Sequence, residues 1–265
     1  MAEIEKKIAR LTEIIGEFTS VMIAFSGGKD SFFLLQTALE VLGRDKVKTV
    51  FVNSDFIGDS DHERLAYFEE KFDLEIIRLE ISVINDKQVS ANPKDRCYIC
   101  KTLIFKNIVQ KATELEIDTV LDGTTFSDLE EYRPGITALE ELKIVSPLRD
   151  AGITSAEIVE RLQQVDIDPY YLSSSTCLAT RFPYNFQLSG ELIKRFDRIE
   201  SFLVRHRIYP VRVRHIDQGI RIETDVENIP KLLEIKDQLI SLGKEEEMKF
   251  ITLDLEGLRS GVWDT

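Results

Sequence analysis

Short apolar runs alternate with amphipathic stretches through the first half of the chain. The runs predict buried strands, because each is brief, apolar and partly β-branched. They are Val21–Phe25, Val47–Val52, Leu74–Leu79 and Thr119–Leu121. The stretches that carry apolar residues at helical spacing predict helices, and they are Asp61–Phe72, Thr102–Leu115 and, behind a Thr154–Glu157 capping box, Ala156–Val165. Strands that alternate with helices predict an α/β domain with a parallel sheet covered on both faces.

The pattern changes after about residue 170. The segments "VRVRHI" and "GIRIET" alternate apolar and polar residues around a turn at Asp217–Gly219, which predicts a hairpin or two adjacent strands. The other elements predicted here are helices at Glu191–Val204 and Ile229–Leu242 and a last strand in Met248–Leu255. We therefore expect a larger domain over residues 1–170 and a smaller α+β domain over residues 171–265. No flexible linker separates them, so we expect them to share an interface.

Composition narrows the class of protein. The 265 residues carry a net charge of -13, which argues against broad binding to nucleic acid, because such binding needs a basic surface. No apolar run approaches a membrane span, and the charged, amphipathic N-terminus differs from a signal peptide. We expect a soluble, cytoplasmic protein without a membrane partner. Its three cysteines cannot form an even disulfide framework, which indicates reduced thiols or metal ligands.

The stretch "SGGKDS" follows the first predicted strand and opens a helix. Glycines there let the backbone approach a ligand closely, and the unpaired N–H groups of a helix start attract negative charge. Hydroxyl and ammonium donors add to this, and the carboxylate of Asp30 can hold a magnesium ion that bridges phosphates. An ordinary tight turn is the alternative. The predicted phosphate-binding residues are Ser26, Gly27, Gly28, Lys29, Asp30 and Ser31.

This loop resembles the pyrophosphate loop of the adenine-nucleotide α-hydrolase-like (PP-loop) superfamily. Further stretches resemble the LarE family, the ATP-dependent sulfur transferases of nickel-pincer nucleotide synthesis. They are "YRPG" (Tyr132–Gly135), "SPLRDAGITSAEI" (Ser146–Ile158), "CLATRFPY" (Cys177–Tyr184), "VRVRH" (Val211–His215) and "LDLEGLRSG" (Leu253–Gly261). The resemblance implies a Rossmann-like PP-loop domain and a homo-oligomer. It also implies that ATP is split into AMP and pyrophosphate to adenylate a pyridinium-3,5-dicarboxylate mononucleotide before sulfur replaces oxygen.

The resemblance also implies site residues. Ser54, Asp122 and Gly123 join the ATP site, with Asp55 near the adenosine, and Asp128, Glu130 and Glu131 belong to the nucleotide and magnesium segment, although a solvated loop is the alternative. Guanidinium groups suit an anionic substrate, and the implied substrate residues are Arg181, Glu200, Arg212, Arg214 and Glu223. Because Arg212 and Arg214 alternate with valines, both point to one face of a strand, which is a solvated face in the alternative interpretation. His215 is a weaker substrate candidate.

The sulfur source depends on Cys97, Cys100 and Cys177. A C-x-x-C pair can chelate a metal. A structural zinc site ordinarily has four ligands, and three thiolates instead fit a [4Fe-4S] cluster with one open iron, as in the three-cysteine branch of the family. Such an iron binds sulfide from an exogenous donor. The alternatives are three inert thiols, a redox disulfide, or a sacrificial Cys177 that gives up its own sulfur.

The leading interpretation is thus an iron–sulfur-dependent sulfur transferase that uses ATP and Mg²⁺. A tRNA thiolase of the same superfamily would use the same adenylation, although the acidic chain carries no recognisable RNA-binding appendage. A module that binds ATP or AMP without catalysis is the third interpretation, and pyrophosphate release distinguishes it from both enzymes.

Overall fold

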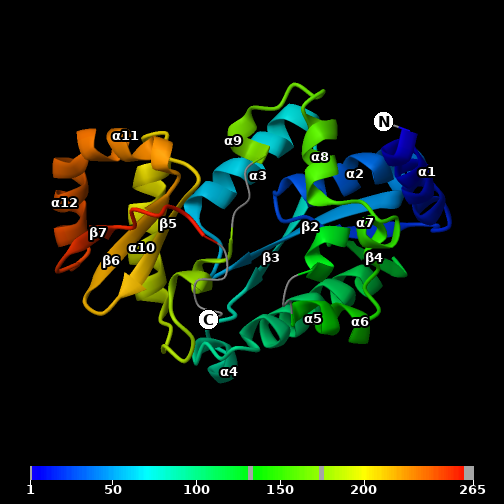
Figure 1. Ribbon diagram of the computed structural model, residues 1–265. Coiled ribbons are helices and arrows are strands. Elements are labelled where there is room, and N and C mark those ends of the chain that lie inside the picture. Colours follow the sequence, from blue (N-terminus) through cyan, green and yellow to red (C-terminus); the bar gives the residue numbers. More distant parts are fainter. Residues whose placement is uncertain (1, 131–133, 173–175, 260–265) are drawn as a thin grey trace. The chain divides into compact units, whose positions relative to one another are not determined.

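A computed structural model describes residues 2–130, 134–172 and 176–259 (Figure 1). The chain forms two compact units. The first comprises residues 1–54, 64–83 and 95–173, and the second comprises residues 55–63, 84–94 and 174–265. Two short segments of the N-terminal half thus belong to the second unit, which the hydrophobic pattern did not indicate.

The first unit contains a four-stranded parallel sheet in the order β3-β2-β1-β4. Its strands are β1 (Val21–Ala24), β2 (Val47–Ser54), β3 (Ile76–Ile81) and β4 (Thr119–Asp122). This confirms the predicted α/β class with a parallel sheet. Strand β3 starts two residues later than predicted, because Asp73 adopts a positive φ of 51° and the N–H of Leu74 still bonds to the Glu69 carbonyl at 3.1 Å.

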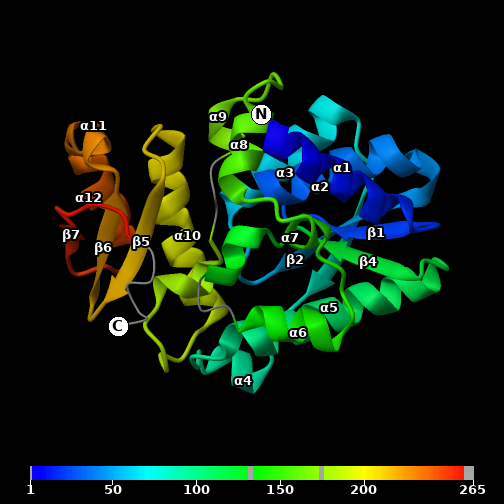
Figure 2. The same ribbon diagram turned by 45° about the vertical axis from the view of Figure 1, so that its right-hand side comes forward.

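Helices cover both faces of this sheet. Those of the first unit are α1 (Ala2–Gly16), α2 (Lys29–Leu42), most of α3 (Asp59–Phe72), α5 (Arg96–Glu114), α6 (Gly135–Glu141), α7 (Pro147–Asp150), α8 (Ser155–Leu162) and α9 (Pro169–Leu172), with 3-10 turns η1 (Arg44–Lys46) and η2 (Phe126–Glu130). Figure 2 shows β1 and β4 side by side, with α1 and α2 above them and α5 and α6 below. Phe105 of α5 and Leu139 of α6 pack against Met22, Val50 and Val120 of the sheet. No helix in the described parts of the chain combines the length and apolar character needed to cross a membrane.

Strand β1 has β2 on one side and β4 on the other, so the strand order reverses there. In such sheets ligands bind beyond the carboxyl ends of the strands at the reversal. The loop after β4 reaches the start of α2, where a Cβ on Gly123 would lie 2.9 Å from the N and Cα atoms of Ser31. Only glycine allows this close approach, which brings the loops after β1 and β4 together.

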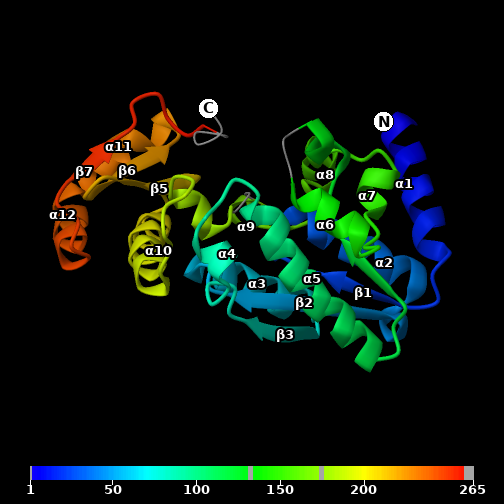
Figure 3. The same cartoon turned by 90° about the horizontal axis from the view of Figure 1, so that it is seen from below.

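The second unit contains a three-stranded sheet in the order β5-β6-β7. Its elements are α4 (Lys87–Ser90), η3 (Leu178–Arg181), α10 (Gly190–Arg205), β5 (Val211–Ile216), β6 (Gly219–Thr224), η4 (Val226–Asn228), α11 (Ile229–Glu234), α12 (Lys236–Glu245) and β7 (Ile251–Leu253). Strands β5 and β6 form the predicted hairpin, and β7 is parallel to β6. Helix α10 packs against β5 and α12 (Figure 3). The single helix predicted at 229–242 is wrong, because Ile235 leaves the helical conformation (φ -100°, ψ 11°) and separates α11 from α12.

A buried ion pair joins the two strands of the hairpin. The side chain of Arg214 is 2% exposed and that of Glu223 is 1% exposed, with Nε and Oε2 2.8 Å apart. Arg221 on β6 donates to the other Glu223 oxygen at 2.8 Å. The solvated-face interpretation of Arg212 and Arg214 is therefore wrong for Arg214. Removing one partner of a buried pair leaves an uncompensated charge, which is strongly destabilising.

A second carboxylate, that of the half-buried Asp197 on α10, holds the segment that follows β2. Its Oδ2 accepts the N–H of Asp59 at 3.1 Å, and a Cβ on Gly58 would lie 2.4 Å from its Oδ1. The hydroxyl of Ser201 donates to the same Oδ1 at 3.3 Å. Burial raises the pKa of Asp197 from 3.8 to about 6, although these hydrogen bonds oppose the shift. Its ionised form is thus less stable in the folded protein than in water.

Replacing Glu223 with alanine should destabilise the second unit, because Arg214 then stays buried without its carboxylate. We expect the free energy of unfolding, measured in urea by circular dichroism, to fall by about 3–5 kcal/mol. Glu13→Ala is the control, since it removes an exposed ion pair with Arg10 and such pairs contribute about 0–1 kcal/mol. Equal free energies of unfolding for Glu223→Ala and Glu13→Ala would contradict a buried ion pair between Arg214 and Glu223.

The Asp197 carboxyl should make stability depend on pH. Its folded-state pKa lies above its ordinary value, so the folded chain holds the proton more tightly, and this contribution is full below about pH 4 and is lost as the pH rises through about 6. Asp197→Asn keeps an oxygen that accepts the Asp59 N–H but carries no charge. Urea unfolding should find the variant more stable than the parent near pH 7.5 and equal to it near pH 4. A difference that stays constant with pH would contradict the raised pKa.

Candidate functional site

The loop between β1 and α2 shapes a helix start without a side-chain cap. Gly27 has a φ of 75°, and Gly28 stands at the N-cap of α2 with no side-chain hydrogen bond to the helix. Ser26 Oγ accepts the N–H of Gly28 at 3.3 Å and lies 3.1 Å from the Ser31 hydroxyl. Ser31 donates to the Gly28 carbonyl at 3.0 Å. The serines therefore hold the loop in shape, while the positive end of α2 stays available to an anion.

Lys29 and Asp30 form an ion pair in the first turn of α2. Lys29 is only 8% exposed, so its side chain is largely withdrawn from water although it opens the helix. Its Nζ lies 3.2 Å from Asp30 Oδ2, and the hydroxyl of Ser155 donates to Oδ1 at 3.1 Å. Burial raises the pKa of Asp30, an effect that Lys29 and Ser155 oppose and that the Asp128 carboxylate adds to. A cation and a carboxylate thus stand together at the mouth of the loop.

The carboxylate of Asp122, at the end of β4, is used to hold the loop that follows the strand. Asp122 is 6% exposed and accepts hydrogen bonds from the hydroxyls of Thr124 and Ser146, both at 2.5 Å. Asp128 accepts from the N–H of Thr125 at 2.7 Å and is close enough to Asp30 to influence it. Asp122 therefore fixes the loop that carries Gly123. Glu131 and the side chain of Glu130 lie outside the described residues.

The residues after β2 divide between the units. Ser54, which ends β2, is half-buried and stays in the first unit beside Ile81 of β3. Asp55 belongs to the second unit, where its carboxylate accepts the N–H of Ile84 at 3.0 Å. The carboxylate of Asp55 thus orders the chain locally.

Cys97 and Cys100 lie in the first turns of α5. This helix starts at Arg96, six residues before the predicted Thr102, so the C-x-x-C pair is helical rather than in a loop. Residues three apart share a helix face, which places both thiols on one side of α5. Cys97 is exposed and Cys100 is partly exposed. The buried guanidinium of Arg96 lies 3.5 Å from Cys97 Sγ, a distance at which its N–H donates to the sulfur.

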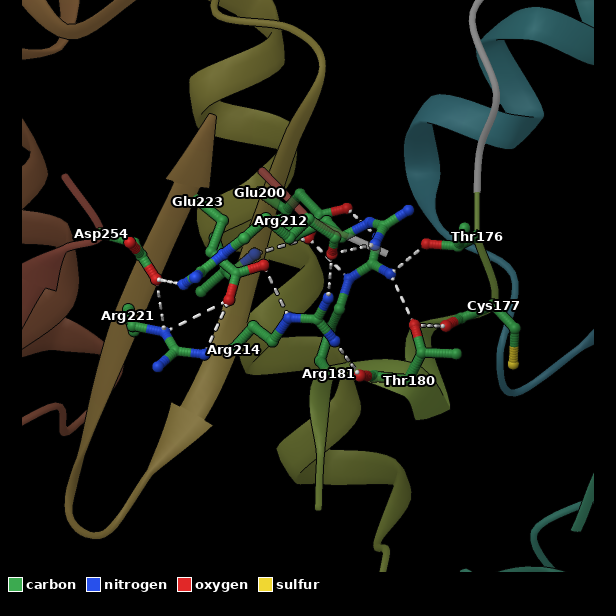
Figure 4. A network of polar contacts seen from close by, with 12 residues as sticks. Thr176, Cys177, Thr180, Arg181, Glu200, Arg212, Arg214, Arg221, Glu223 and Asp254 are labelled. Carbon is green, nitrogen blue, oxygen red and sulfur yellow. Dashed lines mark hydrogen bonds and ion pairs between the residues drawn. The ribbon is translucent and has the colours of Figure 1, made fainter. Parts of the chain in front are cut away.

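Cys177 stands at the N-cap of η3 in the second unit and is exposed. The hydroxyl of Thr180 donates to its carbonyl at 2.7 Å. Arg181 donates to the hydroxyls of Thr176 and Thr180 at 2.6 and 2.9 Å, so one guanidinium spans the residues on either side of the cysteine (Figure 4). The segment that presents Cys177 is therefore held from both ends.

Arg181 is itself held by Glu200 on α10. It is 2% exposed, and its Nε and Nη2 both donate to the Glu200 carboxylate, the former at 2.8 Å. Glu200 Oε2 also accepts the N–H of Val213 on β5 at 3.0 Å. Arg214 donates to the Thr180 carbonyl at 2.8 Å. These contacts tie η3, α10 and β5 together, and they use the N–H groups that Arg181 would offer to a substrate.

Arg212 differs from its neighbours. It is partly buried, and in the described chain it has no carboxylate partner; Nη1 donates to the Arg259 carbonyl at 3.3 Å. Burial lowers the pKa of Arg212 to about 10, and the charges of Arg181 and Arg214 act in the same direction. Figure 4 shows the side chains of Arg181, Arg212, Arg214 and Arg221 interspersed with the carboxylates of Glu200, Glu223 and Asp254. Arg212 thus supplies a local excess of positive charge in an acidic protein.

His215 does not accompany these arginines. Successive strand residues point to opposite faces, and its ring lies 4.3 Å from that of Phe186 and 5.8 Å from that of Phe182, between ring centroids. Burial lowers the pKa of His215. It therefore packs as a neutral ring among phenylalanines, and the substrate role suggested by its sequence neighbours has no support in this geometry.

Within either unit, the described residues bring no three histidine, cysteine or carboxylate side chains together as a metal site. The thiols divide between the units, because Cys97 and Cys100 belong to the first and Cys177 to the second. Two thiols on one helix face suit an iron–sulfur cluster chemically, and the carboxylate of Asp30 suits magnesium. The donor types thus fit both groups.

Several polar side chains around these residues escaped prediction. Thr176 and Thr180 flank Cys177, and Ser155 reaches Asp30 across 125 positions of sequence. The motif that contains Ser155 indicated a capping box, which the structure confirms between Thr154 and Glu157. Nothing in that pattern indicated which side chain the adjacent hydroxyl would meet.

No protein-family profile matches the chain. It is 30% identical to the pyridinium-3,5-bisthiocarboxylic acid mononucleotide synthase of Lactiplantibacillus plantarum, over 98% of this chain and 95% of that protein. An uncharacterized protein of Synechocystis is 30% identical over 97% of this chain and 97% of its own length. An uncharacterized protein of Methanocaldococcus jannaschii is 30% identical over 91% of this chain and 91% of its own length. Similarity of this extent to the synthase and its relatives covers both units, and the chain therefore belongs to the LarE family.

Proposed function

We propose that this protein is an ATP-dependent sulfur transferase that converts the ring carboxylates of a pyridinium-3,5-dicarboxylate mononucleotide into thiocarboxylates. Membership of the LarE family supports the substrate class. The observation that carries the use of ATP is the uncapped start of α2, with Lys29 and Asp30 beside it, at the reversal of strand order. Phosphates bind where backbone N–H groups and a helix dipole converge.

Activation of a carboxylate requires a better leaving group than oxide. Transfer of AMP from ATP supplies it and releases pyrophosphate, and the protein must hold the two anions in line. The N–H groups of the loop and the ammonium of Lys29 bind the phosphates in this proposal. Asp30 would hold Mg²⁺, which neutralises phosphate charge when bound.

The acceptor is also anionic, and in this proposal Arg212 binds it. Arg181 and Arg214 are each paired with a carboxylate, whereas Arg212 has no such partner in the described chain. A guanidinium group with N–H donors to spare suits a phosphate or a carboxylate. Arg181, Glu200, Arg214 and Glu223 then act as the frame that positions Arg212 and Cys177, rather than as ligands of the substrate. Of the five residues that the family resemblance implied for substrate binding, this proposal keeps Arg212 as a ligand and gives the other four a structural role.

Sulfur enters through Cys97, Cys100 and Cys177. As ligands of a [4Fe-4S] cluster, these thiolates would leave one iron open to an exogenous sulfide, which is the chemistry that the cluster supplies. The guanidinium of Arg96 donates a hydrogen bond to the Cys97 sulfur, and Arg181 holds the Cys177 segment in place. A net charge of -13 disfavours a tRNA acceptor for the same chemistry.

Lys29→Ala should greatly slow pyrophosphate release. The variant loses a buried charge at the phosphate site, and we expect turnover to fall by about 10²–10³-fold, the usual loss when one preorganised donor is removed. Lys48→Ala on β2 is the control, because Lys48 is exposed. Pyrophosphate is measured with a coupled enzymatic assay. Turnover by Lys29→Ala at the rate of Lys48→Ala would contradict the ATP site.

Arg212→Ala should weaken binding of the pyridinium nucleotide by about 10–100-fold, which corresponds to one lost hydrogen-bonding interaction with a charged group. ATP binding should be unchanged, since Arg212 belongs to the second unit and the phosphate loop to the first. Isothermal titration of each ligand provides both affinities. Arg205→Ala is the matched control, because it removes an exposed arginine at the end of α10. Unchanged affinity for the acceptor in Arg212→Ala would remove Arg212 from the substrate site.

Replacement of each cysteine by alanine separates the two sulfur sources. If the three thiolates hold one cluster, each variant should lose iron, sulfide and sulfur transfer together, while adenylation survives. The mass of the parent chain should then be unchanged after repeated turnover with added sulfide. A sacrificial Cys177 instead predicts one sulfur per chain and a loss of the elements of hydrogen sulfide from that residue. Intact-mass spectrometry distinguishes the two sulfur sources. A sacrificial Cys177 lowers the mass of the chain, whereas oxidation of cysteine would raise it. Loss of mass at Cys177 with Cys97 and Cys100 dispensable would contradict the cluster.

A further inference from the structure

Ser155 opens α8, and its own backbone is already fixed. Its N–H donates to the hydroxyl of Ser127 at 3.0 Å. The capping box closes the helix start, because Glu157 N–H donates to Thr154 Oγ1 at 3.3 Å and Thr154 N–H donates to Glu157 Oε2 at 2.8 Å. Glu157 is tied in turn to Lys7 of α1 by an ion pair of 2.7 Å. The start of α8 is therefore capped without the Ser155 hydroxyl, and hydrogen bonds fix the backbone that carries it.

That hydroxyl donates to Oδ1 of Asp30 at 3.1 Å, while Lys29 Nζ lies 3.2 Å from Oδ2. Both carboxylate oxygens are thus engaged, one by a neutral hydroxyl and one by an ammonium group. A bound phosphate competes with Asp30 for the Lys29 ammonium, because both are anions. When Lys29 turns toward phosphate, Ser155 is the contact that still fixes the carboxylate, and Oδ2 becomes available to another cation.

We propose that Ser155 is a positioning residue for magnesium binding: its hydroxyl holds Asp30 by Oδ1 so that Oδ2 faces the metal that accompanies ATP. This rests on the proposed function, since it deepens the role of the same loop. Magnesium accepts little deviation from octahedral geometry, so the orientation of a single carboxylate ligand affects its affinity. The positive end of the α8 dipole also favours the ionised form of Asp30, the form that binds a cation, because Asp30 contacts Ser155 at the start of α8.

The test uses Mn²⁺ as a spectroscopic substitute for Mg²⁺, with the full chain and α,β-methylene-ATP, which cannot release pyrophosphate. Electron paramagnetic resonance of free Mn²⁺ gives the metal affinity, and calorimetry in the presence of EDTA gives the affinity for nucleotide alone. Ser155→Ala should weaken Mn²⁺ binding by about tenfold, the order of loss for one hydrogen bond to a charged group. Its affinity for metal-free nucleotide should equal that of the parent.

Two matched variants separate positioning from folding. Ser155→Thr keeps the hydroxyl and should restore Mn²⁺ affinity. Thr154→Ala removes the adjacent cap, which lowers stability by about 1 kcal/mol, but should bind Mn²⁺ as the parent does. Equal Mn²⁺ affinity in Ser155→Ala and the parent would overturn the role of Ser155 and leave the proposed function standing. An equal loss of Mn²⁺ affinity in Thr154→Ala and Ser155→Ala would do the same. Failure of the parent to bind the nucleotide would overturn the proposed function and the role of Ser155 with it.

Discussion

A guanidinium group can be buried only where carboxylates and carbonyls accept its hydrogen bonds, and this constraint organises the second unit. Arg181 is satisfied by Glu200 and two threonine hydroxyls, and Arg214 by Glu223 and the Thr180 carbonyl. Each carboxylate is also bonded by a second group, Val213 N–H or Arg221. The result is a network of paired charges on α10 and the hairpin. Removing one member would leave its partner buried without a compensating charge, which would destabilise the fold. Arg212 lies beside this framework without a described carboxylate, so its charge stays available to a ligand.

The same principle applies at the start of α2 on a smaller scale. Lys29 and Asp30 are partly withdrawn from water and compensate each other, while Ser155 supports the carboxylate from α8. In the proposed function, this pair keeps both charged groups next to the phosphate loop before ATP binds. In the proposed function, the backbone N–H groups of the loop bind phosphate, and Lys29 and Asp30 add a cation and a carboxylate beside them. An acidic chain of net charge -13 can bind an anionic ligand only where positive charge is concentrated locally.

Sequence patterns predicted the features that depend on neighbours along the chain. Apolar runs predicted the strands, and "SGGKDS" predicted the loop, because glycine, serine and a following helix carry their physical meaning locally. Alternation placed Arg212 and Arg214 on one strand face, but burial of Arg214 depends on Glu223 across the hairpin, which alternation does not report. The contact between Ser155 and Asp30 was invisible for the same reason, since tertiary packing of α8 against α2 creates it. Helix α5 was placed too far along the chain because its first turn, with Cys97 and Cys100, lacks an apolar repeat.

We propose that this protein cleaves ATP to activate a carboxylate for attack by sulfur. The stoichiometry of the nucleotide products tests this proposal most directly. Purified protein would be incubated with MgATP and sulfide, with and without the dicarboxylated pyridinium mononucleotide, and the products separated by ion-exchange chromatography. Adenylation of a carboxylate predicts AMP and pyrophosphate in equal amounts, formed only when the acceptor is present. Release of ADP and phosphate, or the same AMP formation without the acceptor, would contradict it.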